Sequence, residues 1–191
     1  MRSARLAGVV LVGGRSARMG RNKARIRLDG VELWRRQLGV LERAGARPVF
    51  LSLRPRQRSF GWSGGEIRDA AADAGPLGGL AAALAVAPAP LVAVLAVDLP
   101  NIDAAWFRRL RQRCRPGTGA VVRGPKGYEP LAAIYPSEAA ALCMARLRAG
   151  RFSLQRLVAA LVRQGRILAL PMRVGDRAML ANWNTGNDAE R

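Results

Sequence analysis

Residues 6–23 read LAGVVLVGGRSARMGRNK, and they give the first indication of the fold class. Its first part, Leu6 to Val12, is a short apolar run that ends at Gly13 and Gly14. A continuous apolar run of this length predicts a strand that is buried on both faces, as in a parallel sheet. A polar loop then continues to about Lys23.

Apolar runs and helical patterns alternate along the rest of the chain. We expect strands over 48–53, 66–69, 91–97, 119–123, 131–135 and 167–170, and helices over 31–44, from the turn at 75–79 to about 87, and over 103–114, 137–147 and 153–163. Asp103, Ser137 and Ser153 are the expected helix caps. This alternation predicts an α/β fold with a mostly parallel central sheet. With no internal repeat or linker, residues 1–191 are expected to form one domain.

The composition excludes several kinds of chemistry. The chain has no histidine, which rules out a Ser-His-Asp triad, a histidine general base and any His-ligated zinc or iron site. Cys114 and Cys143 are too few and too far apart for a thiolate zinc site, and they indicate a reduced, cytosolic protein. The apolar run at 91–99 is too short to span a membrane. The N-terminus resembles a signal peptide but has no small-residue cleavage site, so we expect a cytoplasmic location.

The chain is strongly basic, with a formal net charge of +19. Such a charge suits a polyanionic partner, such as nucleic acid, a membrane surface or a phosphorylated small molecule. However, all of the basic residues except Lys23 and Lys126 are arginine, and they are spread along the whole sequence. The arginines lack the interleaved aromatic residues of an RNA-binding sheet, so background composition explains most of the charge.

Glycines and cations gather after the first strand. Gly13 and Gly14 allow backbone N–H groups to approach phosphate oxygens, and Arg15, Arg18 and Lys23 add positive charge. No Gly-Lys-Ser/Thr follows, so this is not a Walker A loop. The alternative is an ordinary glycine turn, and the retention of a lysine at 23 also agrees with chance.

Acidic residues follow two other expected strands. Asp98 closes the run at 91–97, and Asp69 ends the short strand at 66–69. The carboxyl ends of parallel strands form the ligand-binding edge of such sheets, and a carboxylate there suits Mg²⁺. The alternatives are a turn or cap aspartate before Pro100 and a solvated turn acid at 69.

Five segments together resemble the molybdenum cofactor guanylyltransferases over nearly the whole chain. They are LVGGRSARMGRNK (11–23), GPLGG (75–79), VDLP (97–100), EPLAAIY (129–135) and NWNT (182–185). The resemblance implies a Rossmann-like nucleotidyltransferase fold with helices on both faces of the sheet. It also implies transfer of GMP from GTP to the terminal phosphate of molybdopterin, with release of pyrophosphate and with Mg²⁺ as cofactor.

The resemblance implies a role for each matching residue. The nucleotide-binding residues are Leu11, Val12, Gly13, Gly14, Arg15, Lys23, Ser52, Asp69, Gly75, Pro76, Leu77 and Asp98; the catalytic residues are Lys23, Asp98 and Arg18; the metal ligand is Asp98; and the pterin-side residues are Glu129, Pro130, Asn182 and Asn184. The chain departs from the family pattern in having Val12 for the usual Ala, Glu129-Pro130 for His-Pro, and Asn-Thr-Gly-Asn-Asp at the end of the last motif.

Three other functions remain open from the sequence. A related enzyme could use CTP on molybdopterin, or could act on a sugar phosphate. A basic nucleic-acid-binding or partner-binding protein on the same fold would use the charge without turnover. The guanylyltransferase interpretation expects GTP and molybdopterin as substrates, other cofactor-biosynthesis proteins and target molybdoenzymes as partners, and neither nucleic acid nor a membrane.

Overall fold

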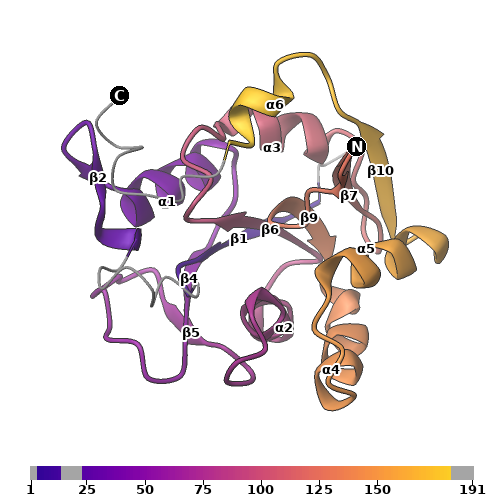
Figure 1. Cartoon of the computed structure of the whole chain (residues 1–191), viewed down its shortest axis with the longest axis horizontal. Coiled ribbons are helices and arrows are strands. Elements are labelled where there is room, and N and C mark those ends of the chain that lie inside the picture. The colour runs from indigo at the N-terminus through magenta and orange to yellow at the C-terminus, as the bar shows by residue number, and fades with distance from the viewer. Residues whose placement is uncertain (1–3, 14–22, 182–191) are drawn as a thin grey trace.

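The computed structural model describes residues 4–13 and 23–181, which form a central sheet between two layers of helices (Figure 1). The strands are β1 (Leu6–Leu11), β2 (Arg27–Leu28), β3 (Val31–Glu32), β4 (Val49–Leu53), β5 (Glu66–Arg68), β6 (Leu91–Ala96), β7 (Gly119–Gly124), β8 (Gly127–Tyr128), β9 (Ala132–Pro136) and β10 (Ile167–Pro171). The helices are α1 (Leu33–Arg43), α2 (Pro76–Val86), α3 (Ala104–Arg111), α4 (Ala140–Arg148), α5 (Leu154–Arg163) and α6 (Asp176–Met179), with 3₁₀ turns at Lys23–Arg25 and Ser137–Ala139.

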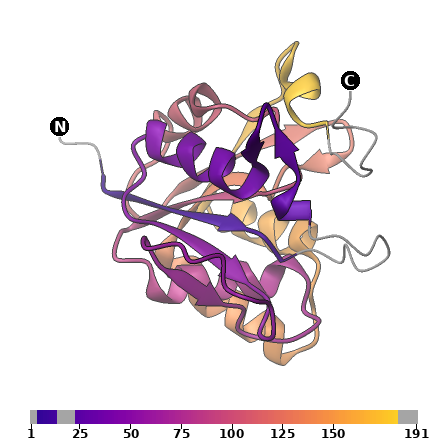
Figure 2. The same ribbon diagram turned by 90° about the vertical axis from the view of Figure 1, so that its left-hand side faces the viewer.

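The central sheet is mostly parallel, as predicted. Its strand order is β10-β7-β9-β6-β1-β4-β5, with β8 paired to β7. β1 pairs in parallel with both β4 and β6, and β4 pairs in parallel with β5. β9 runs antiparallel to β6 and β7. Figure 2 shows β1 and β4 side by side and running in the same direction. The carboxyl ends of β1, β4, β5 and β6 therefore share one edge of the sheet.

Burial on both faces explains the apolar runs of the central strands. Every residue of β1 and of β6 is buried. Val10 faces the core beneath α1 and α3, whereas Val9 and Leu11 face the core beneath α2, α4 and α5. Figure 1 shows these two groups of helices on opposite sides of the sheet, which confirms the predicted arrangement. No helix among the described residues is long and apolar enough to cross a membrane.

Four local predictions have different outcomes. Asp103 and Ser153 cap their helices, with side-chain oxygens that accept from the backbone N–H groups of Trp106 and Arg156. The cap predicted at Ser137 is wrong: a 3₁₀ turn precedes α4, and neither this turn nor α4 has a side-chain cap. The helix predicted from residue 31 begins only at Leu33.

The late start of α1 follows from a small hairpin. β2 and β3 pair antiparallel around Asp29-Gly30, whose φ angles are 52° and 78°. Two successive positive φ angles are typical of the tight turn that Asp-Gly favours. Val31 and Glu32 are therefore drawn into a strand before the helix begins.

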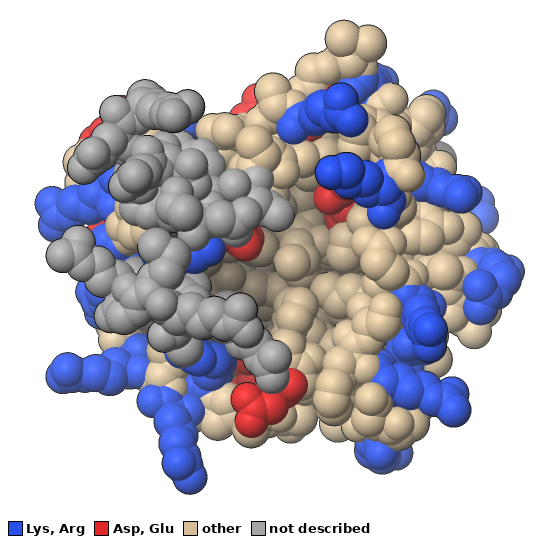
Figure 3. Space-filling view, in the orientation of Figure 1, with Lys and Arg blue, Asp and Glu red and all other residues tan. Residues whose placement is uncertain are grey.

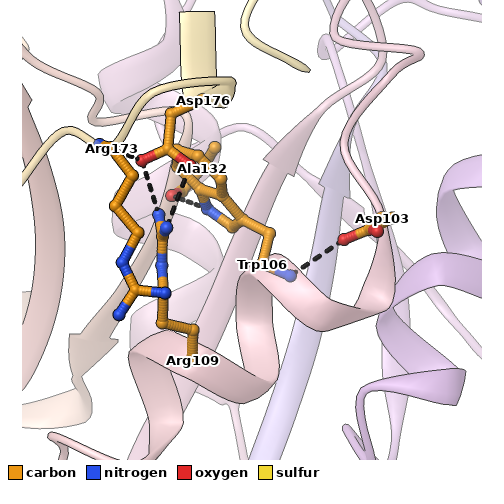
Figure 4. Close-up of polar contacts among 6 residues, drawn as sticks. All are labelled: Asp103, Trp106, Arg109, Ala132, Arg173 and Asp176. Atoms are coloured by element: carbon orange, nitrogen blue, oxygen red, sulfur yellow. Dashed lines mark hydrogen bonds and ion pairs between the residues drawn. The ribbon is translucent and has the colours of Figure 1, made fainter. Parts of the chain in front are cut away.

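The C-terminal helix α6 is held against α3 by a nearly buried ion pair (Figure 4). Both guanidinium NH groups of Arg109 donate to the two carboxylate oxygens of Asp176, each at 2.9 Å. The backbone N–H of Arg173 donates to the same carboxylate at 2.8 Å. The Arg109 guanidinium also stacks on Trp106, whose indole N–H donates to the carbonyl of Ala132. These contacts tie α6 to α3, and α3 in turn to β9.

Breaking this ion pair is expected to destabilise the fold. Asp176→Ala should lower the free energy of unfolding by about 3 kcal/mol, because it leaves a guanidinium that is largely shielded from water without its partner. The matched control is Asp29→Asn, which removes the exposed pair between Asp29 and Arg36 and should change stability by less than about 0.5 kcal/mol. Denaturant unfolding measures both variants, and equal losses would contradict this assignment.

The same pair sets a pH dependence. Burial raises the pKa of Asp176, but hydrogen bonds from Arg109 and Arg173 and the charges of both arginines outweigh burial, so the net pKa is lowered. A lowered pKa means that this stabilisation is present above the unfolded-state pKa of about 4 and is lost as pH falls through the folded-state value. The stability difference between wild type and Asp176→Ala should therefore shrink in acid.

Candidate functional site

Two adjoining cavities open at the carboxyl edge of the sheet, and Gly13 lines both. The large cavity, of about 600 Å³, is lined by Gly13, Arg54, Pro55, Arg56, Gln57, Asp69, Ala71, Ala72, Asp73 and Gly75. The small cavity, of about 200 Å³, is lined by Leu11, Val12, Gly13, Lys23, Pro76, Ala96, Val97, Asp98 and Leu131. Figure 3 views this side of the molecule and shows a hollowed face with acidic and basic side chains around it.

The parallel strands explain why residues far apart in sequence meet here. Val12 and Gly13 follow β1, Asp69 follows β5, and Asp98 follows β6 by two residues. The backbone N–H of Val12 donates to the carbonyl of Ser52 on one side of β1. On the other side, the N–H of Val97 donates to the carbonyl of Leu11. The predicted gathering of strand-end residues is thus present in the structure.

A part-buried hydrogen bond fixes the carboxylate of Asp69. The hydroxyl of Ser52, which is 1% exposed, donates to Oδ1 of Asp69 at 2.6 Å. A Cβ on Gly79 would come within 2.4 Å of that hydroxyl and 3.0 Å of Oδ1, so only glycine fits this position of α2. Burial raises the pKa of Asp69, and the bond from Ser52 and the charge of Arg54 offset that rise only in part. Asp69 lines the large cavity, whereas Ser52 lies behind it as support.

Asp98 and Lys23 form the charged pair of the small cavity. Burial raises the pKa of Asp98, and a hydrogen bond from its own backbone N–H and the charge of the Lys23 ammonium partly counter that rise. Lys23 begins the 3₁₀ turn Lys23–Arg25. An ammonium in such a small, partly shielded cavity can bind a phosphate group directly. A carboxylate in the same cavity can bind that phosphate through a divalent cation.

The start of α2 contributes backbone to both cavities. Gly75 caps the helix with φ 60° and ψ −152° and lines the large cavity, and Pro76 lines the small one. The N–H of Ala70 donates to the carbonyl of Gly78, which ties the segment after Asp69 to the helix. Leu77, in contrast, is fully buried in the core beneath α2 and lines neither cavity.

The residues predicted for the pterin side are placed only in part. Glu129 and Pro130 follow β8 and are half-buried, but neither lines either of the two cavities described above, whereas the next residue, Leu131, lines the small one. Burial raises the pKa of Glu129. The predicted site residues Gly14, Arg15, Arg18, Asn182 and Asn184 lie outside the described residues.

Sequence reasoning missed several residues of the large cavity. No helix or strand is expected between residues 53 and 66, yet Arg54, Arg56 and Gln57 from this segment form one wall of the large cavity. The side-chain amide of Gln57 accepts from the N–H of Arg54 and donates to the carbonyl of Val12 at 3.4 Å, which folds this wall back onto β1. Asp73 also lines the cavity, in a left-handed conformation with φ 57°. The one sequence signal for these residues was the gathering of polar residues after β4.

The side chains that could serve as metal ligands limit the kind of metal that could bind. Among the described residues, no group of three or more His, Cys, Asp and Glu side chains could hold a metal ion. The small cavity offers the single carboxylate of Asp98. Mg²⁺ commonly binds through one or two carboxylates and completes its shell with water and substrate phosphates. The site therefore fits a divalent cation that arrives with a phosphorylated ligand.

Comparisons with known proteins agree with this geometry. Residues 8–167 match the family model described as MobA-like NTP transferase domain. A protein of Opitutus terrae named "Probable molybdenum cofactor guanylyltransferase" is 51% identical over 189 residues, covering 97% of this chain and 94% of its own.

Solved structures share the fold at lower identity. A molybdopterin-guanine dinucleotide biosynthesis protein A from Archaeoglobus fulgidus superposes with a TM-score of 0.72 at 22% identity, covering 96% of this chain and 95% of its own. A Mycobacterium tuberculosis protein in complex with manganese gives 0.57 at 19% identity, covering 92% and 98%. The family match over most of the chain, together with the curated relative, places it: this chain belongs to the MobA-like NTP transferase domain family.

Proposed function

We propose that this chain is a molybdenum cofactor guanylyltransferase, which transfers GMP from GTP to the terminal phosphate of molybdopterin and releases pyrophosphate. The observation that carries the proposal is the pairing of Asp98 and Lys23 in the small cavity beside Gly13. The curated relative at 51% identity bears the name of this activity. We also propose that residues 1–191 form one nucleotidyltransferase domain that works in the cytoplasm.

The reaction we propose needs no protein nucleophile. A phosphate oxygen of molybdopterin, already ionised at neutral pH, attacks the α-phosphorus of GTP in line with the departing pyrophosphate. This agrees with the absence of histidine from the chain, since no general base is required. Catalysis then consists of positioning and of neutralising charge.

Lys23 and Asp98 have different roles in neutralising this charge. Lys23 offsets the negative charge that builds up on the pyrophosphate, with Arg15 or Arg18 as further cations. Asp98 holds a divalent cation, which we propose is Mg²⁺. When bound, this ion neutralises phosphate oxygens and makes the α-phosphorus a better electrophile. Asp98 serves here as an anchor, and its carboxylate takes no proton in the reaction.

We assign the nucleoside to the large cavity and the phosphates to the small one. The two cavities meet at Gly13. A Cβ at this position would come within 2.9 Å of the Arg54 side chain, so that side chain lies close against the backbone of Gly13. Asp69 presents a carboxylate whose Oδ1 already accepts from Ser52, which orients the carboxylate for the N–H donors of a base or for the hydroxyls of ribose. Glu129, Pro130, Asn182 and Asn184 are proposed for the pterin side.

Pyrophosphate release tests this proposal. The purified chain is mixed with Mg²⁺ and molybdopterin and with GTP, CTP or ATP in turn, and pyrophosphate is measured by a coupled assay. We expect release with GTP that depends on molybdopterin. Release with CTP alone would keep the reaction class and change the product, and release with none of the three would overturn the proposal.

A further inference from the structure

The turn that carries Asp98 is contacted from α1 by a buried amide. Gln37 is 0% exposed, and its Nε2–H donates to the carbonyl of Leu99 at 2.7 Å across 62 residues of sequence. On α1 this residue lies on the inner face with Trp34, Leu38 and Leu41, which are all buried apolar side chains. A polar side chain at this position therefore interrupts the apolar face at the point where it meets the turn.

Closing the turn does not require this amide. The carbonyl of Leu99 also accepts from the N–H of Ile102 at 3.2 Å, and the N–H of Leu99 donates to the carbonyl of Ala96. These backbone bonds remain if the Gln37 side chain is replaced. The turn would therefore form with an apolar residue at 37.

Stability alone does not favour glutamine here either. The Oε1 atom of Gln37 is buried and has no hydrogen-bond partner among the described residues. Burying a polar atom without a partner is costly, and an apolar side chain of similar shape avoids that cost. The presence of glutamine at position 37 is thus better explained by the geometry that its amide imposes on the Leu99 carbonyl than by a gain in the free energy of folding.

That geometry bears directly on Asp98. Upstream, the N–H of Val97 ties the chain to β1 through the carbonyl of Leu11. Downstream, the bond from Gln37 fixes the peptide that joins Leu99 to Pro100, whose ring restricts the backbone further. Asp98 lies between these two fixed points and lines the small cavity together with Lys23.

We propose that Gln37 is a positioning residue that holds the Asp98 carboxylate in the orientation needed to bind a divalent cation together with the nucleotide phosphates. This inference rests on the proposed function, because it takes Asp98 as the cation anchor. Gln37 itself touches neither cation nor substrate.

The test measures how strongly Mn²⁺ tightens GTP binding, without any turnover. The dissociation constant of GTP is determined by calorimetry with and without Mn²⁺, and the ratio of the two gives the coupling between metal and nucleotide. Gln37→Met keeps the length of the side chain and removes the amide. We expect it to reduce the coupling about tenfold, the scale on which partners of metal ligands act, while metal-free GTP binding stays unchanged.

Two further variants separate positioning from a general packing effect. Leu41→Met changes a fully buried side chain on the same helix and should leave the coupling as in wild type. Adding Gln37→Met to Asp98→Asn should cause no further loss, because Gln37 acts through Asp98. A wild-type coupling in Gln37→Met, or an equal loss in Leu41→Met, overturns the role of Gln37 alone. The absence of coupling in wild type overturns the anchor role of Asp98, and the role of Gln37 with it.

Discussion

Replacing Asp98 by asparagine is expected to lower kcat about 1,000-fold, since the loss of charge stabilisation by several kcal/mol corresponds to about three powers of ten. The dissociation constant of GTP in the presence of metal should rise by far less, about 30-fold at most, because the variant leaves unchanged the large cavity to which we assign the nucleoside. Single-turnover transfer and equilibrium GTP binding measure the two effects separately.

The matched control for Asp98→Asn is Asp103→Asn. Asp103 lies five residues away, caps α3 through a bond to the N–H of Trp106 and lines neither cavity. Asparagine caps helices as well as aspartate does, so activity should stay within about twofold of wild type. Equal losses of kcat and of GTP affinity in Asp98→Asn would contradict the role of Asp98 as a cation anchor in the transfer step.

Replacing Lys23 by methionine is expected to lower the transfer rate at saturating GTP about 100-fold. Methionine keeps an unbranched, apolar side chain but removes the ammonium to which we assign the neutralisation of charge on the departing pyrophosphate. The control is Lys126→Met, which changes the chain's other lysine, an exposed residue between β7 and β8, and should leave the rate unchanged.

Lys23→Arg tests the shape of the cation. The small cavity holds about 200 Å³, and a planar guanidinium presents its charge differently from a compact ammonium. We expect a rate between those of wild type and Lys23→Met. A fully active Lys23→Met enzyme would remove Lys23 from the transfer step altogether.

The sequence predicts the parts of the fold that depend on local pattern. The apolar runs at 6–12 and 91–97 become β1 and β6 because burial on both faces requires apolar residues on both sides of the strand. Asp69 and Asp98 could be chosen as candidates because parallel strands bring their carboxyl ends to one edge. The hairpin at Asp29-Gly30 also has a local signal, which the longer helical pattern from residue 31 obscured.

Other features depend on contacts between distant segments, which no local pattern encodes. α6 forms where Asp176 meets Arg109, 67 residues earlier in the chain, and the contact of Gln37 with Leu99 spans a similar distance. The wall formed by Arg54 and Gln57 exists only because this loop folds back onto the end of β1. Leu77 belongs to a nucleotide-binding motif by sequence, but its side chain lies in the core.

The most direct test of the central claim follows two labels on GTP through the reaction with Mg²⁺ and molybdopterin. One sample carries radioactive phosphorus at the α-position and the other at the γ-position. The account predicts that the α-label moves to the pterin product and that the γ-label leaves as pyrophosphate. Release of the α-label as free GMP, or transfer of the γ-label to the pterin, would contradict it.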